Sequence, residues 1–261
     1  MTNRSAVFAV NSSSLLGSNG SEIAFLQGFS GTPNEFVAFV EALFREAEAG
    51  QRGELLWLRE AKRHFVVLGS SRPAHADVDL GVCQATDIPV VRRFSGGGTV
   101  LQGPGSLCFT LLLKHDLRPE VASGVQSADR YVLSRMMAVL APLIGAVEMA
   151  GVCDLTANGK KFAGNAQRRG RVFTLYHGSI LNGLDLDLMS SVLRLPDRRP
   201  EYRGARAHHE FVRNLELPRS RLEQLIRRAW SASLEADPPG PEAVRRLVTE
   251  RYGRAEWTYR F

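Results

Sequence analysis

Cysteine is scarce in this sequence, and the three that occur, Cys83, Cys108 and Cys153, lie far apart among 261 residues. An odd number of widely spaced cysteines argues against a disulfide scaffold. The sequence also has no C-x-x-C pair, which argues against a zinc ribbon. The composition therefore favours a chain that is stabilised by its hydrophobic core, and this length is ample for one.

Long hydrophobic runs are also missing. The first eleven residues contain one short apolar run, Ala6–Val10, which is at the short limit for a signal peptide and has no cleavage pattern after it. Such a run is too short to span a bilayer. Hydrophobic residues make up 44% of the chain, which is ordinary for a globular protein. We therefore expect a cytoplasmic protein without a membrane partner.

Acidic residues are outnumbered by basic ones, and the formal net charge is +6. A basic surface attracts acidic partners, and nucleic acid is the first of these to consider. Here the positive charge is mostly arginine spread along the chain, with no basic patch interleaved with aromatic residues. We therefore expect no nucleic-acid partner, and a non-enzymatic basic binding module stays open as an alternative function.

The pattern along the chain predicts an N-terminal leader and one larger domain. Residues 1–30 are rich in serine, glycine and asparagine and are expected to be variable or poorly ordered, and the domain is expected over 31–261. Apolar residues at helical spacing predict helices at 35–44, 127–143, 219–234 and 241–252. Strands are predicted at 55–58, 64–69, 88–93, 100–101, 106–113, 148–156, 162–169 and 172–181, with a hairpin at Asn158-Gly159. This mixture indicates an α+β fold, with a mixed or antiparallel sheet and flanking helices.

A run of three glycines follows two arginines, directly after the apolar run Ile88–Val91. Glycine admits positive φ and close approach of a ligand, and successive N–H groups in such a turn can bind an anion. The arginines add fork-shaped donors suited to phosphate or carboxylate. The alternative is a glycine-rich hairpin turn with solvated arginines. The anion-binding interpretation predicts ligand contacts from Arg92, Arg93, Ser95, Gly96, Gly97, Gly98 and Thr99.

Two later stretches strengthen the anion-binding interpretation: Asn158-Gly159-Lys160-Lys161-Phe162-Ala163-Gly164-Asn165-Ala166-Gln167 and Tyr176-His177-Gly178-Ser179-Ile180-Leu181. Together with the glycine turn they resemble the family of lipoate–protein ligases, octanoyltransferases and biotin ligases. That family has RR-x-S-G-G-G, (G/N)-(R/K)-K-x-x-G-x-(A/S) and H-G-x-(L/I)-L in this order. The resemblance covers roughly residues 34–257 and is strongest to lipoate–protein ligases, because Ser95-Gly96-Gly97-Gly98 is intact. It implies the catalytic-domain fold of biotin and lipoate ligases.

The resemblance also implies a reaction. A lipoyl or octanoyl group would be activated with ATP as an acyl-adenylate and attached to a lysine of a lipoyl-carrier domain, in 2-oxoacid dehydrogenases or the glycine cleavage H protein. Lys161 occupies the position of the lysine that bridges the acyl carbonyl and the phosphate, where a fixed cation stabilises developing charge. Asp154 matches the acid of the family's Asn-Asp-Leu segment and would orient Lys161 or hold Mg²⁺ through the phosphates. Further ligand contacts are expected from Gly164, Asn165, His177 and Gly178.

Cys153 departs from the ligase pattern, in which asparagine usually precedes the aspartate. A thiolate near Lys161 would have a lowered pKa and could accept an acyl group, as a cysteine of some octanoyltransferases does. The alternative enzyme is therefore a cysteine-dependent octanoyl or lipoyl transferase that acts without ATP, and the alternative role for Cys153 is a buried, unreactive thiol. Biotin attachment is disfavoured, because the Gly-Arg-Gly-Arg-x-Gly motif is absent.

Two other departures concern substrate entry and the C-terminus. Leu101-Gln102-Gly103 stands where ligases often have Tyr-His-Asp after the glycine motif. Trp257 resembles the tryptophan that closes the large domain of lipoate–protein ligases, many of which continue into a small accessory domain. We expect no separate C-terminal accessory domain in this chain. Either a second polypeptide would then complete adenylation, or the acyl group would be transferred without ATP.

Overall fold

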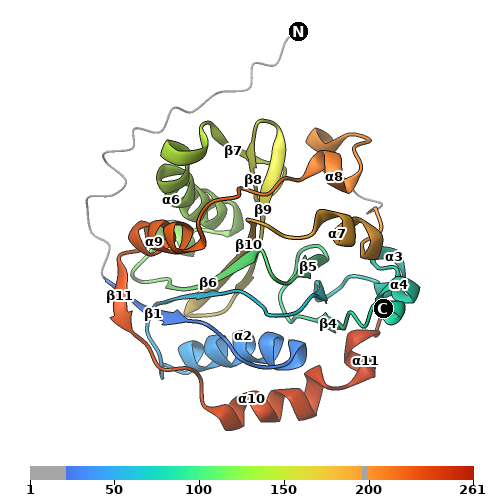
Figure 1. Ribbon diagram of the computed structural model, residues 1–261. Coiled ribbons are helices and arrows are strands. Elements are labelled where there is room, and N and C mark those ends of the chain that lie inside the picture. The colour runs from blue at the N-terminus through green and yellow to red at the C-terminus, as the bar shows by residue number, and fades with distance from the viewer. Residues whose placement is uncertain (1–21, 196–198) are drawn as a thin grey trace.

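The computed structural model describes residues 22–195 and 199–261. Its strands form an eight-stranded sheet in the order β11-β1-β2-β6-β10-β9-β8-β7 and a three-stranded sheet in the order β4-β3-β5 (Figure 1). Both sheets are mixed, because β1 runs parallel to β2 and β11, and β3 runs parallel to β4. The strands are β1 (Ile23–Gln27), β2 (Leu55–Arg59), β3 (Phe65–Leu68), β4 (Val90–Arg92), β5 (Val100–Gln102), β6 (Ser106–Lys114), β7 (Val147–Ala150), β8 (Asp154–Ala157), β9 (Lys160–Arg169), β10 (Phe173–Leu181) and β11 (Ala232–Glu235).

Helices cover both faces of the large sheet (Figure 1). The helices are α2 (Pro33–Glu48), α3 (Ala74–Asp77), α4 (Leu80–Ala85), α5 (Pro119–Ala122), α6 (Val125–Ile144), α7 (Leu186–Val192), α8 (His208–Phe211), α9 (Arg219–Ala229), α10 (Pro241–Leu247) and α11 (Ala255–Thr258), with a 3₁₀ helix η1 (Glu201–Arg203) and a π-helix η2 (Val248–Tyr252). Helix α2 begins where Thr32 and Glu35 form a capping box and Pro33 takes the first turn. Sequence-local signals therefore fix the start of the helix that covers one face.

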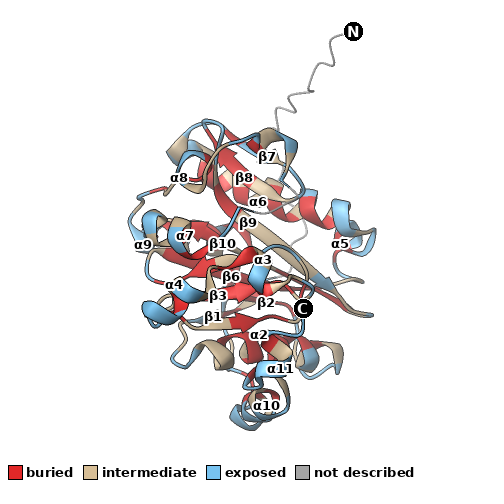
Figure 2. Ribbon diagram, turned by 90° about the vertical axis from the view of Figure 1, so that its right-hand side faces the viewer, coloured by how far each residue is buried: buried red, intermediate tan, exposed pale blue. Residues whose placement is uncertain are grey.

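The central strand β2 shows how the two faces are filled. All five of its residues are buried. Leu56 and Leu58 pack with the apolar residues of α6 and α9 on one side, whereas Leu55 and Trp57 pack with α2 on the other. Buried residues accordingly concentrate in the middle layer, with exposed residues on the outer helices (Figure 2). Because β2 is buried on both faces, it reads as a continuous apolar run rather than an alternating one.

The α+β prediction is confirmed, and so are several of its elements. The hairpin at Asn158-Gly159 joins β8 to β9, with φ of 53° and 70° at its two turn residues. Both angles are positive, as a type I′ turn requires. The helix predicted at 127–143 lies within α6. The extended segment predicted at 148–156 is instead two strands, β7 and β8, paired with each other around Gly151.

Two predictions at the edge of the large sheet were wrong. Strand β1 lies inside the segment predicted to be a poorly ordered leader, of which residues 1–21 are outside the described residues. The helix predicted at 219–234 ends at Ala229, and Ser231 takes a positive φ of 47° before β11 begins. Both strands are short. Among the described strands, β11 pairs only with β1, about two hundred residues earlier, and β1 pairs with both β11 and β2, contacts that local patterns do not reveal.

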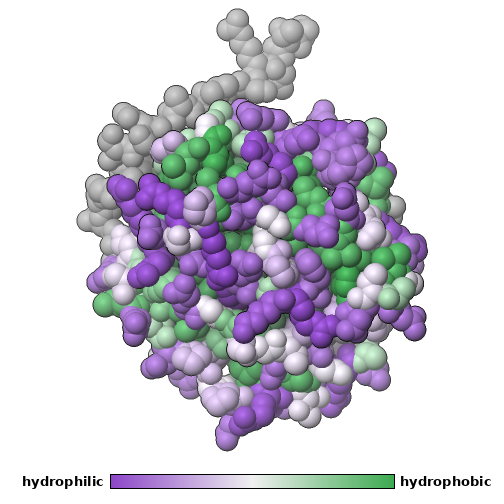
Figure 3. Space-filling model, in the orientation of Figure 1, coloured by the Kyte–Doolittle hydropathy of each residue, from purple (hydrophilic) through white to green (hydrophobic). Residues whose placement is uncertain are grey.

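The surface in the view of Figure 3 is divided, because hydrophilic residues separate its hydrophobic patches from one another. Within the described residues, no helix is both long enough and apolar enough to cross a membrane.

Candidate active site

The sheet brings two of the three sequence motifs side by side. Strands β9 and β10 are antiparallel neighbours, with His177 opposite Ala166 and Ser179 opposite Gly164. The glycine turn between β4 and β5 reaches them from the small sheet, where Ser95 Oγ lies 2.8 Å from His177 Nε2. Segments separated by more than sixty positions in the sequence therefore form one surface.

Arg93 organises the glycine turn. Its guanidinium donates to the carbonyl oxygens of Gly96, at 2.6 Å, and Gly98, at 2.8 Å. Carbonyls held toward Arg93 leave the peptide N–H groups of the turn directed elsewhere, and none of the backbone N–H groups of 96–98 donates a hydrogen bond within the described residues. The turn thus has the free N–H groups that an anion-binding nest requires.

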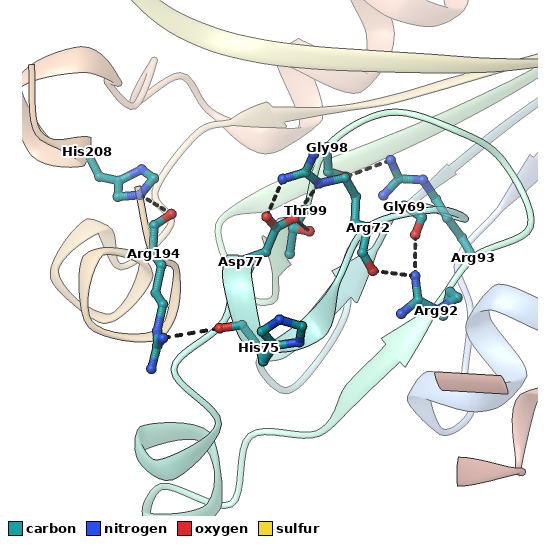
Figure 4. Close-up of polar contacts among 10 residues, drawn as sticks. All are labelled: Gly69, Arg72, His75, Asp77, Arg92, Arg93, Gly98, Thr99, Arg194 and His208. Carbon is teal, nitrogen blue, oxygen red and sulfur yellow. Dashed lines mark hydrogen bonds and ion pairs between the residues drawn. The ribbon is translucent and has the colours of Figure 1, made fainter. Parts of the chain in front are cut away.

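Arg92, although predicted to contact a ligand, is not brought to the same place. Its side chain is fully buried and donates to the carbonyl oxygens of Gly69 and Arg72 (Figure 4). It also donates to the carbonyl oxygens of Trp257 and Thr258, near the other end of the chain. It therefore ties the C-terminal helix α11 to the loop after β3. Alternating strand residues point to opposite faces, which explains why two adjacent arginines have different roles.

Gly97 occupies the tightest part of the turn. Its φ is +90°, and a Cβ there would lie 2.8 Å from Arg93 Nη2 and 3.0 Å from Ala166 Cβ. Thr99, at the end of the turn, donates through its hydroxyl to Asp77, which also pairs with Arg72 (Figure 4). These hydrogen bonds lower the pKa of Asp77, against a desolvation effect that acts in the opposite direction. The carboxylate is therefore an anchor for the turn.

Lys161 is held by an acid from the neighbouring strand. Its Nζ lies 2.7 Å from Asp154 Oδ1, and the other oxygen of Asp154 accepts a hydrogen bond of 2.6 Å from the Tyr202 hydroxyl. The ammonium lies over Gly164, where a Cβ would come within 2.8 Å of Nζ. Lys160, in contrast, is exposed. A side chain at position 164 would thus displace the cation.

Gly178 has a similar steric role on β10, since a Cβ there would collide with Asn165 Oδ1 and lie 2.8 Å from Gly164 O. The Asn165 amide donates to Cys153 O at 2.6 Å, and the Cys153 thiol donates to Asn165 O at 3.0 Å. Asn165 therefore fixes the turn between β7 and β8 rather than standing free. Its Oδ1 is buried and has no protein partner among the described residues.

Two cavities meet at this surface. The first cavity, of about 520 Å³, extends between the large sheet and α2 and is lined by Phe36, Val37, Val40, Arg59 and Val67 among others. The second cavity, of about 400 Å³, extends toward α7 and α8 and is lined by Met189, Leu193, Arg194, Arg203, His208 and Phe211 among others. Their shared wall consists of Gly97, Gly98, Thr99, Val100, Asp154, Lys161, Gly164, Ser179 and Pro200.

Most of the predicted site residues line one or both cavities. Gly97, Gly98, Thr99, Asp154, Lys161 and Gly164 belong to the shared wall, and Arg93, Cys153, Asn165, His177 and Gly178 line the first cavity. Ser95 and Gly96 line neither cavity; they support the turn through the His177 and Arg93 contacts.

Two side chains that line the first cavity, Cys153 and His177, have pKa values far from their ordinary ones. Burial raises the pKa of the Cys153 thiol to about 12, and the carboxylates of Asp129 and Asp154 add to the effect, which Lys161 only partly opposes. The sequence left two roles open for Cys153, an acyl-accepting thiolate with a lowered pKa and a buried, unreactive thiol. The raised pKa favours the buried thiol, because burial and two acids outweigh one ammonium. Burial and the charges of Arg93 and Arg59 hold the pKa of His177 well below its ordinary value. The imidazole is therefore neutral near pH 7.

Sequence reasoning missed Arg59 and Tyr202. Arg59 alternates with Trp57 on one face of β2, and an arginine at an inward position of a buried strand is itself a signal. Tyr202 lies in the 3₁₀ helix η1, 33 residues after the end of β9, and no local pattern relates it to Asp154.

Comparison with known proteins identifies the family. The sequence profile of the lipoyl protein ligase A/B catalytic domain matches residues 32–229. The chain belongs to this family. It is an enzyme of the lipoate–protein ligase and octanoyltransferase kind, as the resemblance of its motifs predicted. The family assignment rests on the whole matched segment, which contains the glycine turn, the lysine–glycine strand and the His-Gly strand.

Two relatives represent the two activities within the family. Subunit 1 of lipoate-protein ligase A from Thermoplasma acidophilum is 24% identical over 238 residues, covering 85% of this chain and 90% of the relative. The octanoyltransferase LipM from Carboxydothermus hydrogenoformans is 26% identical over 273 residues, which cover 89% of this chain and 96% of the relative. The two identities are nearly equal, so they do not separate ligase from transferase.

Solved structures show the same fold. A lipoate-protein ligase A bound with ATP superposes with a TM-score of 0.77 at 21% identity, over 92% of this chain and 99% of the other. A bipartite lipoate protein ligase from Thermoplasma acidophilum, described with its E2 lipoyl domain, superposes with a TM-score of 0.75 at 22% identity. The superposition covers 91% of this chain and 96% of the other. The fold predicted from the family resemblance is therefore confirmed.

Proposed function

We propose that this chain is an ATP-dependent ligase, which activates lipoate or octanoate as an acyl-adenylate and attaches the acyl group to a lysine of a lipoyl-carrier domain. The observation that carries the proposal is the meeting of two cavities at Lys161. A transferase that passes an acyl group from a carrier through a cysteine needs one acyl cavity, whereas an adenylating enzyme needs a second one for the nucleotide.

The first cavity suits the acyl chain and the second suits ATP. Phe36, Val37 and Val40 of α2 give the first an apolar wall. The second has basic side chains from Arg194 and Arg203 beside an apolar floor, which suits phosphates and a base. The ATP-bound ligase of the same fold supports nucleotide binding by this architecture.

Both chemical steps would occur at the shared wall. In the first, an oxygen of the acid attacks the α-phosphorus of ATP and pyrophosphate leaves. In the second, the acceptor lysine amine attacks the acyl carbonyl, an amide bond forms and AMP leaves. Lys161 and the N–H groups of Gly97 and Gly98 would stabilise the negative charge in both steps, and Asp154 would keep the ammonium in place.

Both oxygens of Asp154 already have partners, Lys161 and Tyr202, so a role toward Mg²⁺ would require the ion to share one of them. Within the described residues, no three side chains of the histidine, cysteine or acidic types form a metal cluster. Mg²⁺ at nucleotide sites, however, is commonly bound through one or two carboxylates together with substrate phosphates. Asp154 is the carboxylate of the shared wall, and Mg²⁺ bound there would neutralise phosphate charge.

The proposed partners are lipoyl-carrier domains of 2-oxoacid dehydrogenases or the glycine cleavage H protein, together with a separate accessory polypeptide. The bipartite Thermoplasma ligase and its E2 lipoyl domain support both partners. The net charge of +6 also favours an acidic carrier.

A cysteine-dependent transferase is the second candidate. The similarity to an octanoyltransferase favours it, and Cys153 lines the first cavity. Its chemistry requires a thiolate, and the raised pKa of Cys153 disfavours one at neutral pH.

Reconstitution with the purified protein and an apo lipoyl domain, in the presence and absence of the accessory subunit of a bipartite ligase, tests the proposal. One reaction contains lipoate, ATP and Mg²⁺, and a second contains octanoyl-carrier protein without ATP. If the protein is a ligase, the lipoyl domain should be modified in the first reaction and not in the second. Modification in the second only would replace the proposal with the transferase.

A further inference from the structure

A straight row of residues crosses the large sheet beneath the first cavity. Gly164 on β9 lies opposite Ser179 on β10, Ser179 lies opposite Cys108 on β6, and Cys108 lies opposite Arg59 on β2. Directly opposite residues face the same side of a sheet, and three spacings between neighbouring strands amount to about 14 Å. The row therefore runs from the Lys161 ammonium, which lies over Gly164, to Arg59 at the other end of the cavity.

Arg59 is a buried cation without a counter-ion. It is 2% exposed, and no carboxylate pairs with it among the described residues. Its guanidinium stacks over the rings of Trp57, at 3.8 Å, and Phe36, at 4.2 Å, and Nη1 donates to Thr110 Oγ1 at 3.0 Å. Its Nε is buried with no protein partner. Burying an unpaired charge is costly, so a structural role alone does not account for an arginine here.

The other polar groups at this end are donors as well. Gln102 lines the first cavity, and its Oε1 accepts hydrogen bonds from Ser106 Oγ at 3.1 Å and Cys108 Sγ at 2.6 Å. The amide N–H groups of Gln102 are then its remaining hydrogen-bonding groups. The neighbouring acid, Glu60, is engaged elsewhere, with the Gly105 N–H and Arg219. This end of the cavity thus offers hydrogen-bond donors and positive charge.

We propose that Arg59 selects an acyl chain that carries an oxygen acceptor, most strongly a carboxylate, at the end remote from the reacting carboxyl group. This inference rests on the proposed function, because it takes the first cavity as the acyl site. An alkyl end such as that of octanoate provides nothing to compensate the buried guanidinium. A second carboxylate pairs with it through charge-assisted hydrogen bonds.

Calorimetric binding of free acids to the full-length chain, without ATP, tests the inference. The acids are octanedioate, 8-hydroxyoctanoate, octanoate and lipoate. We expect the wild type to bind octanedioate at least tenfold more tightly than octanoate or lipoate, with 8-hydroxyoctanoate between them, because neither apolar end can pair with Arg59. Arg59→Met should reverse the order of octanedioate and octanoate, while Arg63→Met, which alters an exposed arginine, should leave it unchanged.

Equal or tighter binding of octanoate by the wild type would overturn the inference, and so would an unchanged ratio in a folded Arg59→Met protein. The wild-type ratio is sufficient by itself if the variant does not fold. Because binding is measured without ATP, the two proposals fail separately. If the protein prefers octanedioate tenfold but forms no acyl-adenylate with any acid, the proposed selectivity of Arg59 stands and the proposed ligase function is wrong. If the protein transfers octanoate with ATP but binds octanedioate and octanoate equally, the ligase function stands and the proposed selectivity of Arg59 is wrong.

Discussion

The first and second cavities share one wall but differ in what surrounds it. The first lies between α2 and the large sheet, with Phe36, Val37 and Val40 on one side. Two buried guanidinium groups line it, that of Arg93 at the glycine turn and that of Arg59 at the far end. The second lies beside α7 and α8 and carries Arg194, Arg203 and the Arg72–Asp77 pair at its edge. The first cavity therefore has an apolar wall on the α2 side and polar side chains on the side of the sheet and the glycine turn, whereas the second combines charge with an apolar floor.

This difference suggests a division of labour. Substitutions on the outer walls should affect one ligand at a time, whereas substitutions on the shared wall should affect the chemistry that joins them. Binding that is uniform in ground and transition states changes KM, and charge stabilisation at the reacting atoms changes kcat.

The largest effect is expected at Lys161. Lys161→Ala removes the cation of the shared wall and should lower kcat for carrier modification roughly 100-fold or more, because preorganised charge at the reacting centre contributes that much. Lys160→Ala is the matched control, since Lys160 is exposed and should leave kcat within about twofold. Steady-state kinetics and circular dichroism of both variants check this. Near-normal transfer by a folded Lys161→Ala protein would remove the assignment of the site.

The glycine turn comes next. Gly97→Ala places a Cβ at positive φ and close to Arg93 and Ala166, so affinity for a non-hydrolysable acyl-adenylate analogue should fall at least tenfold. Gly96→Ala is the control, because a Cβ at Gly96 meets nothing within 4 Å and its φ is not in the positive range. Isothermal titration gives both affinities. Equal losses of affinity in the two variants would contradict this prediction, because they would show that any substitution in the turn weakens binding and that Gly97 has no special contact with the ligand.

Two matched substitutions, one on the outer wall of each cavity, test whether the two cavities bind different ligands. Val40 lines only the first cavity and Leu193 only the second. Val40→Phe should raise KM for the acid about tenfold with KM for ATP unchanged, and Leu193→Phe should do the converse, because filling a packed site costs about 1–3 kcal/mol. Initial rates with each substrate varied in turn measure both constants. If either variant changed both KM values equally, the two cavities would not be separate ligand sites.

The smallest effect is expected at Cys153. Cys153→Ser should retain ATP-dependent activity within about twofold, since a neutral thiol is not the nucleophile. The raised pKa predicts that the thiol stays protonated below about pH 12, so alkylation of Cys153 by iodoacetamide should be slow at pH 7 and keep rising about tenfold per pH unit up to pH 10. Peptide mapping over this pH range measures it. A rate that levels off near pH 8 would indicate an activated thiolate.

The sequence predicted the parts of the site that are local in the chain. The glycine turn, the Asn158-Gly159 hairpin and the strand containing Lys161 each have a signature in consecutive residues, and the structure brings them together. Arg92 could not be told from Arg93, because only the position of α11 shows which guanidinium is buried beneath the C-terminal helix.

The remaining features depend on contacts between distant segments. Strand β11 is held by β1, and β1 lies between β11 and β2, while neither β1 nor β11 has a strong pattern alone. The Tyr202–Asp154 hydrogen bond joins residues 48 positions apart. The direction of the Cys153 pKa shift could not be decided from the sequence, because Asp129, on α6, and the extent of burial are properties of the packed fold.

The most direct test of the account follows the activated acyl group itself. Wild-type protein, together with the accessory subunit of a bipartite ligase, is incubated with lipoate, ATP and Mg²⁺ without a carrier. The mixture is then quenched and separated for mass spectrometry of small molecules and of the intact chain. The account predicts lipoyl-AMP in the small-molecule fraction, an unmodified protein mass, and loss of lipoyl-AMP in Lys161→Ala but not in Cys153→Ser. An acyl adduct on Cys153 that forms from an acyl donor without ATP, and that passes to a lipoyl domain added afterwards, would contradict it.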